Sequence, residues 1–299
     1  MPGQKMHPGE MDITVGLVAG LIAGQFPQWA SLPIRPVVSA GTVHVMFRLG
    51  ADMAVRLPRV PPGSDALIAK RLWLPRLVPY LPVAVPAPIG EGRPTQEYPG
   101  SWSVLRWLGG ANPVADHLAA PGLLAADLAE FVAACRKIDL TGGPAAYRGG
   151  PLAELSEETL GAIEELHGLV DTDLATAVWR DAARLPQWSG PGVWVHADLM
   201  PGNLLTVGGR LSAVIDFDAA GIGDPACDLI VAWNLLPASV RTAYRRAVGV
   251  DEATWTRGRG RALSMALIQL PYYQDTNPVM AANARHTIRE VLADHQDAT

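Results

Sequence analysis

The 299-residue sequence has little cysteine, little charge and no long apolar run. Its two cysteines, Cys135 and Cys227, are too few for the disulfide framework of a small secreted protein, so we expect two reduced thiols. The apolar run near residues 15–23 is too short to span a bilayer, and the N-terminus lacks the apolar core of a signal peptide. These absences predict a soluble, cytoplasmic protein without a membrane partner.

Charged residues make up only 18% of the chain and hydrophobic residues 49%, a composition that excludes global disorder. A chain of this length exceeds one usual hydrophobic core and predicts two lobes. Residues 1–108 carry 10 basic and 6 acidic side chains, and residues 109–299 carry 14 and 23. The first part suits polyphosphate, and the second suits a cationic acceptor such as an amino sugar. No basic stripe with interleaved aromatics occurs, so no nucleic-acid partner is expected.

The most informative stretch is residues 193–228, where a short apolar strand precedes a polar loop and two further apolar runs. The sequence Gly-Gly-Arg at 208–210 separates those runs and predicts a hairpin. If the hairpin loop has three residues, the register places Asn203 beside Ile215. An amide and two carboxylates then gather at one end of a small sheet.

The chemistry of Asp198, Asn203 and Asp216 favours phosphoryl transfer. Oxygen ligands such as Asn203 and Asp216 suit Mg²⁺, which leaves Asp198 to orient a hydroxyl and accept its proton. Kinase-type phosphoryl transfer divides the work in this way. Two alternatives stay open: these are plain loop and turn residues of an α/β domain, or His196 and Asp198 bind zinc. Zinc is the weaker alternative, since no HExxH pattern occurs.

The loop HADLMPGN at 196–203, followed by IDF at 215–217 and GDP at 223–225, resembles the aminoglycoside phosphotransferase family and its macrolide and small-metabolite kinase relatives. Ala197 stands where glycine is usual in that family. The resemblance implies an α+β, two-lobed protein-kinase-like fold. A small β-rich N-lobe would occupy residues 1–108 and a mostly helical C-lobe residues 109–299.

The resemblance also implies roles for single residues. Asp198 would be the catalytic carboxylate, and Asn203 and Asp216 would hold Mg²⁺. The residues expected to support the site without reacting are His196, Asp224 and Asp228.

Nucleotide-binding residues are expected in the N-lobe, where short strands are predicted at 45–49 and 53–57. The loop residues Ser39, Gly41 and Thr42 would cover the phosphates with backbone N–H groups, although a plain hairpin turn explains them equally. Arg56 stands where many family members have lysine and would neutralise the donor phosphates; Arg59 is a second candidate. The alternative is a surface arginine on an edge strand.

The helix predicted at 64–77 should supply a glutamate to pair with that cation, but the sequence has none between residues 50 and 90. Asp65 is the only acid in it, and capping explains it equally well. The strand at 101–108 resembles the hinge between the lobes. The backbone of Arg106, Trp107 and Leu108 would pair with the base, which leaves ATP and GTP indistinguishable.

Helices are predicted at 13–26 with Asp12 as N-cap, and at 114–120, 123–138, 156–170, 173–185, 229–236, 238–247, 251–269 and 281–293. A polar aromatic loop at 271–278 is expected to interrupt the last two. Its candidate substrate contacts are Tyr272, Tyr273 and Asp275. The alternative for this loop is a plain helix–helix connection.

These patterns and the resemblance predict an ATP- or GTP-dependent O-phosphotransferase with Mg²⁺ as cofactor. It would phosphorylate a hydroxyl of a small molecule, with an antibiotic of the aminoglycoside, macrolide or nucleoside type as the expected acceptor. Resistance or self-protection would follow. A housekeeping metabolite kinase and a non-catalytic nucleotide-binding regulator are the alternatives, and the oligomeric state stays open.

Overall fold

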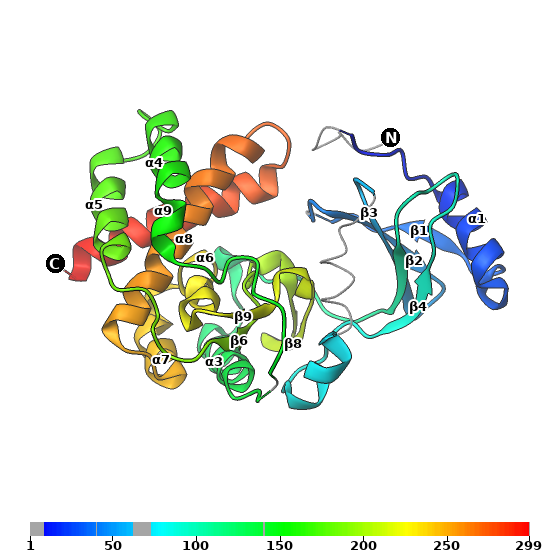
Figure 1. Cartoon of the computed structure of the whole chain (residues 1–299), viewed down its shortest axis with the longest axis horizontal. Coiled ribbons are helices and arrows are strands. Elements are labelled where there is room, and N and C mark those ends of the chain that lie inside the picture. Colours follow the sequence, from blue (N-terminus) through cyan, green and yellow to red (C-terminus); the bar gives the residue numbers. More distant parts are fainter. Residues whose placement is uncertain (1–8, 40, 62–72, 140, 299) are drawn as a thin grey trace. The chain divides into compact units, whose positions relative to one another are not determined.

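The computed structural model of the chain describes residues 9–39, 41–61, 73–139 and 141–298. The chain divides into two compact units (Figure 1). The N-terminal unit contains Met1–Pro75 and Val85–Gly109, and the helical unit contains Arg76–Ala84 and Gly110–Thr299. Among the described residues, no helix combines the length and apolarity needed to cross a bilayer.

The N-terminal unit is built on a five-stranded antiparallel sheet with the strand order β1-β2-β3-β5-β4. Its strands are β1 (Ile34–Pro36), β2 (His44–Leu49), β3 (Met53–Pro58), β4 (Pro88–Gly92) and β5 (Trp102–Arg106). Gly50 makes the β2–β3 turn with a φ of +60°, which glycine adopts without steric cost. The strands predicted at 45–49 and 53–57 are confirmed.

Helix α1 (Val15–Gln25) covers one face of this sheet (Figure 1). Its buried side chains Val18, Leu21 and Ile22 pack into the cluster that the sheet residues form, and burying each such side chain stabilises by roughly 1.5–3 kcal/mol. The prediction of Asp12 as N-cap is wrong. The Oγ1 of Thr14 accepts from the N–H of Leu17 at 3.2 Å, so the helix begins later.

The helix predicted at residues 64–77 lies mostly outside the described residues, and so does Asp65. Its described part, residues 73–77, is helical. Glu10 and Met11 contact Arg59, which directly follows β3. Glu10 is 8% exposed and pairs with Arg59 at 3.5 Å, and the N–H of Met11 donates to the Arg59 carbonyl at 3.0 Å.

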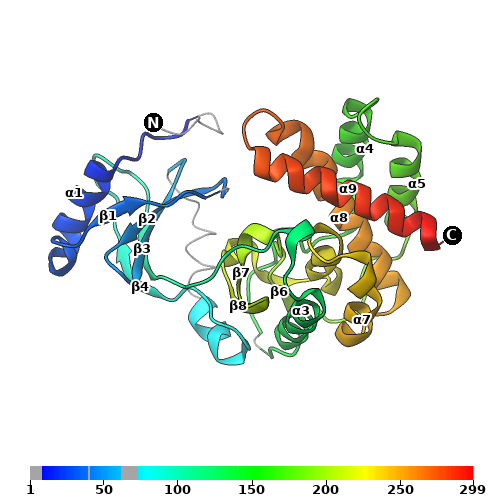
Figure 2. The same cartoon turned by 180° about the vertical axis from the view of Figure 1, so that it is seen from behind.

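The helical unit contains seven α-helices within the described residues, and two two-stranded sheets. The helices are α3 (Pro121–Arg136), α4 (Ser156–Glu165), α5 (Thr172–Ala183), α6 (Val231–Asn234), α7 (Ala238–Val248), α8 (Glu252–Tyr273) and α9 (Pro278–Ala298). The strands are β6 (Val193–Val195), β7 (Leu204–Val207), β8 (Arg210–Val214) and β9 (Gly221–Gly223). Figure 2 shows α8 and α9 running side by side, and their contacts are the most extensive between any two helices of the unit.

Several helix predictions are wrong in extent. Helix α4 ends at Glu165 instead of residue 170, and the segment predicted at 229–236 is α-helical only at Val231–Asn234, after a 3₁₀ segment at Pro225–Ile230. Residues 114–120 form only a short 3₁₀ turn at Ala115–His117, because proline precedes the segment and Pro121 opens the next helix. Helix α8 does not end at residue 269 but continues through Pro271 to Tyr273. A proline this close to a helix end disrupts little, and the neighbouring Leu270 is buried.

Candidate active site

The residues singled out in the sequence lie around the β7–β8 hairpin of the helical unit. The N–H of Ile215 donates to the Asn203 carbonyl at 2.8 Å, so the predicted pairing of these two residues is confirmed. The hairpin loop has two residues, Gly208 and Gly209 with φ of +59° and +79°, instead of three. A register shift between Leu205 and Thr206 compensates for the missing residue.

Asp198 follows β6 and is held by two side chains. The Nδ2 of Asn203 donates to its Oδ2 at 2.8 Å, and the Nη1 of Arg148 donates to its Oδ1 at 2.7 Å. The Asp198 side chain is 26% exposed and that of Arg148 is 32% exposed. Asp198 is therefore an oriented carboxylate that solvent or a ligand can reach.

His196 anchors the loop through both ring nitrogens and is only 1% exposed. The backbone N–H of Asp198 donates to its Nδ1 at 3.3 Å, so Nδ1 is the acceptor. Its Nε2 lies 3.0 Å from the Ile215 carbonyl, which can only accept, so Nε2 carries the proton. This neutral tautomer ties the Asp198 loop to the strand that leads to Asp216.

Asp228 holds the same loop from beneath and is 1% exposed. Its Oδ2 accepts from the N–H of His196 at 2.9 Å and its Oδ1 from the N–H of Ala197 at 2.7 Å. Burial raises the pKa of the Asp228 carboxyl, and the backbone N–H groups of His196 and Ala197 that donate to it oppose that rise. The bonds fix Ala197 at a φ of +62°, a left-handed conformation that favours glycine.

Asp224 has different partners from Asp228, although both were expected to brace the site. Its Oδ1 caps the turn after it by accepting from the N–H of Ala226 at 2.9 Å. Its Oδ2 accepts from the Nε of Arg257 at 2.9 Å and lies 3.6 Å from an amino group of Arg261. Both arginines are at most 4% exposed, so this is a buried ionic cluster.

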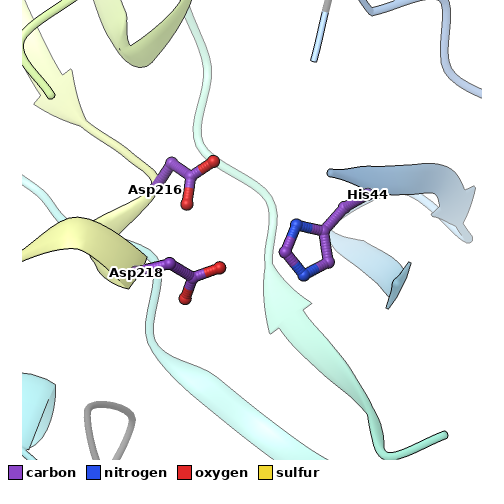
Figure 3. Close-up of side chains that lie close together, drawn as sticks. All are labelled: His44, Asp216 and Asp218. Atoms are coloured by element: carbon purple, nitrogen blue, oxygen red, sulfur yellow. The ribbon is translucent and has the colours of Figure 1, made fainter. Parts of the chain in front are cut away.

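Asp216 and Asp218 together offer a set of ligands for a hard cation. Asp216 has a φ of +62°, and a carboxylate oxygen of each residue lies within 4.8 Å of the other. Both carboxylates face the same direction in Figure 3. The amide nitrogen of Asn203 is directed at Asp198, which leaves its Oδ1 available as an acceptor. This all-oxygen donor set fits Mg²⁺.

The predicted nucleotide-binding residues lie in the N-terminal unit. The N–H of Gly41 donates to the Oγ of Ser39 at 3.0 Å, and Thr42 lies two residues before the start of β2. Arg56 lies on β3 with its Nη2 3.0 Å from the Nδ1 of His44, and Arg59 is paired with Glu10 as described above.

Two of the three residues of the expected hinge, Arg106 and Trp107, already use their backbone N–H groups in bonds to other strands and loops. The N–H of Arg106 donates to the Ala87 carbonyl at 3.0 Å, and that of Trp107 to the Asp52 carbonyl at 2.8 Å. The guanidinium of Arg48 covers the Trp107 ring at 4.1 Å, so this ring is packed. Leu108 is the hinge residue whose N–H is not consumed by these strand contacts.

The three candidate substrate contacts lie at the end of α8. Tyr272 and Tyr273 belong to its last turn, with their rings perpendicular at 4.8 Å, and Tyr272 is 52% exposed. Asp275 is exposed in the turn before α9. The prediction that Tyr272 and Tyr273 lie in a loop is wrong, because the helix continues through Pro271.

Several residues of the site were missed in the sequence. Arg148, Asp218, Arg257 and Arg261 contact it as described, and the Nδ2 of Asn112 donates to the carbonyls of Gly202 and Leu204 at 2.9 and 2.8 Å. Asp218 could have been found, since it lies two residues after Asp216 on the same turn. The glycines around Arg148 are its local signal in the sequence, whereas Asn112, Arg257 and Arg261 have no comparable signal.

The chain matches the model of the phosphotransferase enzyme family over residues 36–263. No curated protein matches it significantly. Among solved structures, the GDP and kanamycin complex of APH(2")-IIia has a TM-score of 0.73 and 19% identity, covering 93% of this chain and 98% of that one.

Two other structures are similar. The ADP-bound aminoglycoside phosphotransferase APH(2'')-Ib has a TM-score of 0.59 and 14% identity, covering 93% of this chain and 98% of its own. The apoenzyme of macrolide 2'-phosphotransferase MphH from Brachybacterium faecium has a TM-score of 0.62 and 20% identity, covering 92% and 97%. The expected two-lobed kinase-like fold is thereby confirmed. Because the family model spans residues 36–263 of the 299, this chain belongs to the phosphotransferase enzyme family.

Proposed function

We propose that this phosphotransferase transfers the γ-phosphoryl group of ATP or GTP to a hydroxyl of a small molecule, with an antibiotic as the expected acceptor. One observation carries the proposal. The β7–β8 hairpin holds the oriented carboxylate of Asp198 and the Asp216–Asp218 pair in one unit, joined through Asn203.

Asp198 is the proposed catalytic residue. Its Oδ1 accepts from Arg148 and its Oδ2 from Asn203. Because a carboxylate oxygen has two lone-pair directions, an acceptor hydroxyl can still donate to it. The hydroxyl oxygen would attack the γ-phosphorus while Asp198 takes up the hydroxyl proton, and the bond from the γ-phosphorus to the bridging oxygen would break to release the nucleoside diphosphate. His196 is not proposed as the base, because both of its nitrogens are used in holding the loop.

Asp216, Asp218 and Asn203 are the residues proposed to hold Mg²⁺. When bound, Mg²⁺ would neutralise charge that develops on the phosphate oxygens. The side chains themselves provide oxygen donors only, and their partial exposure leaves room for water and phosphate ligands.

The N-terminal unit is proposed to bind the nucleotide. Arg56 would neutralise the donor phosphates, and the backbone of Ser39, Gly41 and Thr42 would contact them. Of the hinge residues, Leu108 is favoured for the base contact, since the N–H groups of Arg106 and Trp107 are already used. The similar structures contain GDP in one case and ADP in another, so both ATP and GTP are kept as donors.

The acceptor is proposed to meet the helical unit. Tyr272, Tyr273 and Asp275 are candidate contacts because they are grouped at the exposed end of α8. A housekeeping metabolite kinase remains the alternative within the class, and a nucleotide-binding regulator the alternative outside it. Both cysteines are unpaired and buried, which supports the proposed cytoplasmic location.

A γ-labelled nucleotide assay over a panel of alcohols separates these alternatives. The panel contains aminoglycosides, macrolides, nucleosides and common metabolites, each with ATP and with GTP. Labelled product from an antibiotic supports the proposal, and product from a metabolite alone favours the housekeeping kinase. Tight nucleotide binding with no labelled product from any alcohol would favour the regulator.

The metal assignment has its own test. Asp216→Ala should weaken Mg²⁺-nucleotide binding and lower turnover together, whereas Asp275→Ala, an exposed acid on the same unit, should leave metal-dependent binding unchanged. Unchanged turnover and metal dependence in Asp216→Ala would show that the cation binds elsewhere.

A further inference from the structure

The loop at residues 141–150 carries an arginine that contacts the proposed catalytic carboxylate. The Nη1 of Arg148 donates to the Oδ1 of Asp198 at 2.7 Å, while the Nδ2 of Asn203 donates to the Oδ2 at 2.8 Å. Each carboxylate oxygen therefore has a donor from a different segment of the chain. Rotation of this carboxylate would break at least one hydrogen bond, and the bond from Arg148 is charge-assisted. Arg148 thus helps to fix the direction in which Asp198 meets an acceptor.

The same guanidinium lies against an exposed aromatic ring. The Cζ of Arg148 is 5.6 Å from the centre of the Tyr147 ring, within the usual range of a cation–π contact. The Tyr147 residue is 76% exposed, and the side chains of Arg148 and Asp198 are partly exposed. One guanidinium therefore contacts both the Tyr147 ring and the Asp198 carboxylate. The ring lies beside the group that would take the proton of the acceptor.

Backbone hydrogen bonds tie this loop to the segment that follows Asp218. The N–H of Ala146 donates to the Ile222 carbonyl at 3.0 Å, and the N–H of Tyr147 donates to the Ala219 carbonyl at 3.0 Å. Ala219 directly follows Asp218, which is one of the proposed metal ligands. The backbone of Tyr147 is therefore held next to the segment that would bind the cation.

The carbonyl of Arg148 is held by buried groups. It accepts from the Nη1 of Arg261 at 2.7 Å and from the Sγ of Cys227 at 3.2 Å. Arg261 is 3% exposed and lies 3.6 Å from the Asp224 carboxylate. Buried polar groups on one side and backbone bonds on the other therefore fix the loop that carries the exposed ring. A contact surface that is already ordered costs less conformational entropy when a ligand binds.

From these contacts we propose that Tyr147 and Arg148 form the acceptor platform of this enzyme. Arg148 is the positioning residue that orients Asp198, and the exposed ring of Tyr147 binds a ring of the acceptor. The inference rests on the proposed function and deepens it, because it narrows the acceptor class to alcohols that carry a ring near the reacting hydroxyl. Acyclic alcohols such as choline and homoserine offer no ring face and fall outside this class.

The two residues of the platform should affect different kinetic constants. A tyrosine ring offers a large contact face at low cost in conformational entropy, because few side-chain torsions need to be fixed. Stacking against such a ring is worth about 3- to 10-fold in affinity, which appears in KM. A displacement of about 1 Å in a catalytic group can cost roughly 10²-fold in rate, so the loss of Arg148 should appear in kcat.

The test measures kcat and KM of the full-length chain with γ-labelled ATP and GTP. Kanamycin, erythromycin and uridine are the ring-bearing acceptors, and choline and homoserine are the acyclic ones. The wild type is compared with Arg148→Gln, Arg148→Lys, Tyr147→Ala and Tyr147→Phe.

The chain offers a matched control for each position. Arg245 is 31% exposed, forms a 2.7 Å ion pair with Glu252 and lies 5.5 Å from the centre of the Trp255 ring, so Arg245→Gln removes the same kinds of contact elsewhere. Tyr80 is a tyrosine of the same unit and is 51% exposed, so Tyr80→Ala removes an exposed ring that has no proposed role.

We expect Arg148→Gln to lower kcat by about 10- to 100-fold, with KM within about threefold of the wild-type value. Arg148→Lys should recover part of that kcat, because lysine keeps the charge without the planar fork of donors. Tyr147→Ala should raise KM for ring-bearing acceptors by about 3- to 10-fold, and Tyr147→Phe should keep the wild-type KM because the ring remains. Both control variants should keep the wild-type constants.

A thermal melt of each variant separates loss of folding from loss of function. Should Arg148→Gln not fold, Tyr147→Ala decides, because its side chain is exposed. A raised KM then supports the inference, and a wild-type KM overturns it.

The failures are distinguishable. Full kcat in a folded Arg148→Gln, a wild-type KM in Tyr147→Ala, or phosphorylation of acyclic alcohols alone overturns the inference and keeps the proposed phosphotransferase. If the wild type labels no alcohol of this set or of the wider panel, the proposed function fails and this inference falls with it.

Discussion

Asp228→Asn removes one of the two acceptor oxygens that hold the loop after β6. In the wild type the two carboxylate oxygens accept from the N–H groups of His196 and Ala197 at 2.9 and 2.7 Å. Asparagine has one oxygen, so its amide group faces one of these donors, which then lacks a partner in a buried site. The loop that carries Asp198 therefore loses one of its two hydrogen bonds to residue 228.

The magnitude can be worked from these bonds. An unsatisfied buried N–H group costs about 1–3 kcal/mol, and the surviving bond loses roughly 1 kcal/mol because its acceptor is no longer ionised. The variant also no longer buries a charge, and the raised pKa of Asp228 indicates that this burial is costly in the wild type. We expect a net loss of about 1–3 kcal/mol at pH 7, which lowers Tm by roughly 2–6 °C.

The loss should depend on pH with a defined sign. The pKa of Asp228 is raised above the ordinary value of 3.8, so the folded state binds its proton more tightly than the unfolded state does. The stability that this proton contributes is present below pH 3.8 and is lost as pH rises through the folded pKa. The wild type therefore gains from this group on acidification and Asp228→Asn does not, so the difference between them widens as pH falls from 7 towards 4.

Urea unfolding of both proteins at several pH values, with kcat measured beside it, checks this reasoning. Asp251→Asn is the control, because Asp251 caps α8 through the N–H of Thr254 at 2.7 Å and asparagine caps equally well. We expect a 10- to 100-fold fall in kcat for Asp228→Asn and almost none for the control. Differences in unfolding free energy below roughly 0.5 kcal/mol lie within the usual scatter between variants. A change in the free energy of unfolding within that range, together with full kcat, would refute the bracing role of Asp228.

Three further predictions concern the helical unit. Arg257→Ala should destabilise by about 3–5 kcal/mol in urea unfolding, because it leaves the buried Asp224 carboxylate without its 2.9 Å partner, and a loss below about 1 kcal/mol would contradict this. Ala197→Gly should change stability by less than roughly 1 kcal/mol, since relief of the left-handed strain offsets the added backbone entropy, whereas Ala197→Val should cost more than about 2 kcal/mol; equal effects would argue against the strain. Burial raises the pKa of Cys227 to about 12 and also raises that of Cys135, so neither thiol should react with a thiol reagent at pH 8 until denaturant is added, and rapid reaction in the native protein would show that a thiol is accessible.

The parts of the site that the sequence predicts are those governed by local patterns. Alternation and paired glycines determine a hairpin, so the pairing of Asn203 with Ile215 could be predicted. The loop length could not, because the two-residue turn and the register shift after Leu205 cancel within the same hairpin. Thr14 and Asp12 are both acceptable N-caps by type, and only the packing of α1 on its sheet decides between them.

The parts that the sequence does not predict depend on contacts between distant segments. Arg148 lies 50 residues before Asp198, and nothing in its own segment indicates which carboxylate it will meet. Arg257, Arg259 and Arg261 on α8 are of a residue type that is usually exposed, but all three are at most 8% exposed. Acidic partners on other elements, Asp224 and Asp294, make that burial possible, and such pairing has no periodicity to detect.

Turnover and nucleotide affinity of Asp198→Ala and Asp198→Asn, measured side by side with any acceptor that the panel identifies, test the central claim most directly. If Asp198 takes the proton of the acceptor hydroxyl, kcat should fall by about 10²- to 10⁴-fold in both variants. The Kd of the Mg²⁺-nucleotide should stay within about twofold of the wild-type value, since Asp198 is not assigned to the cation or to the nucleotide. Full turnover in either variant, or a loss that comes entirely from nucleotide binding, would contradict the account.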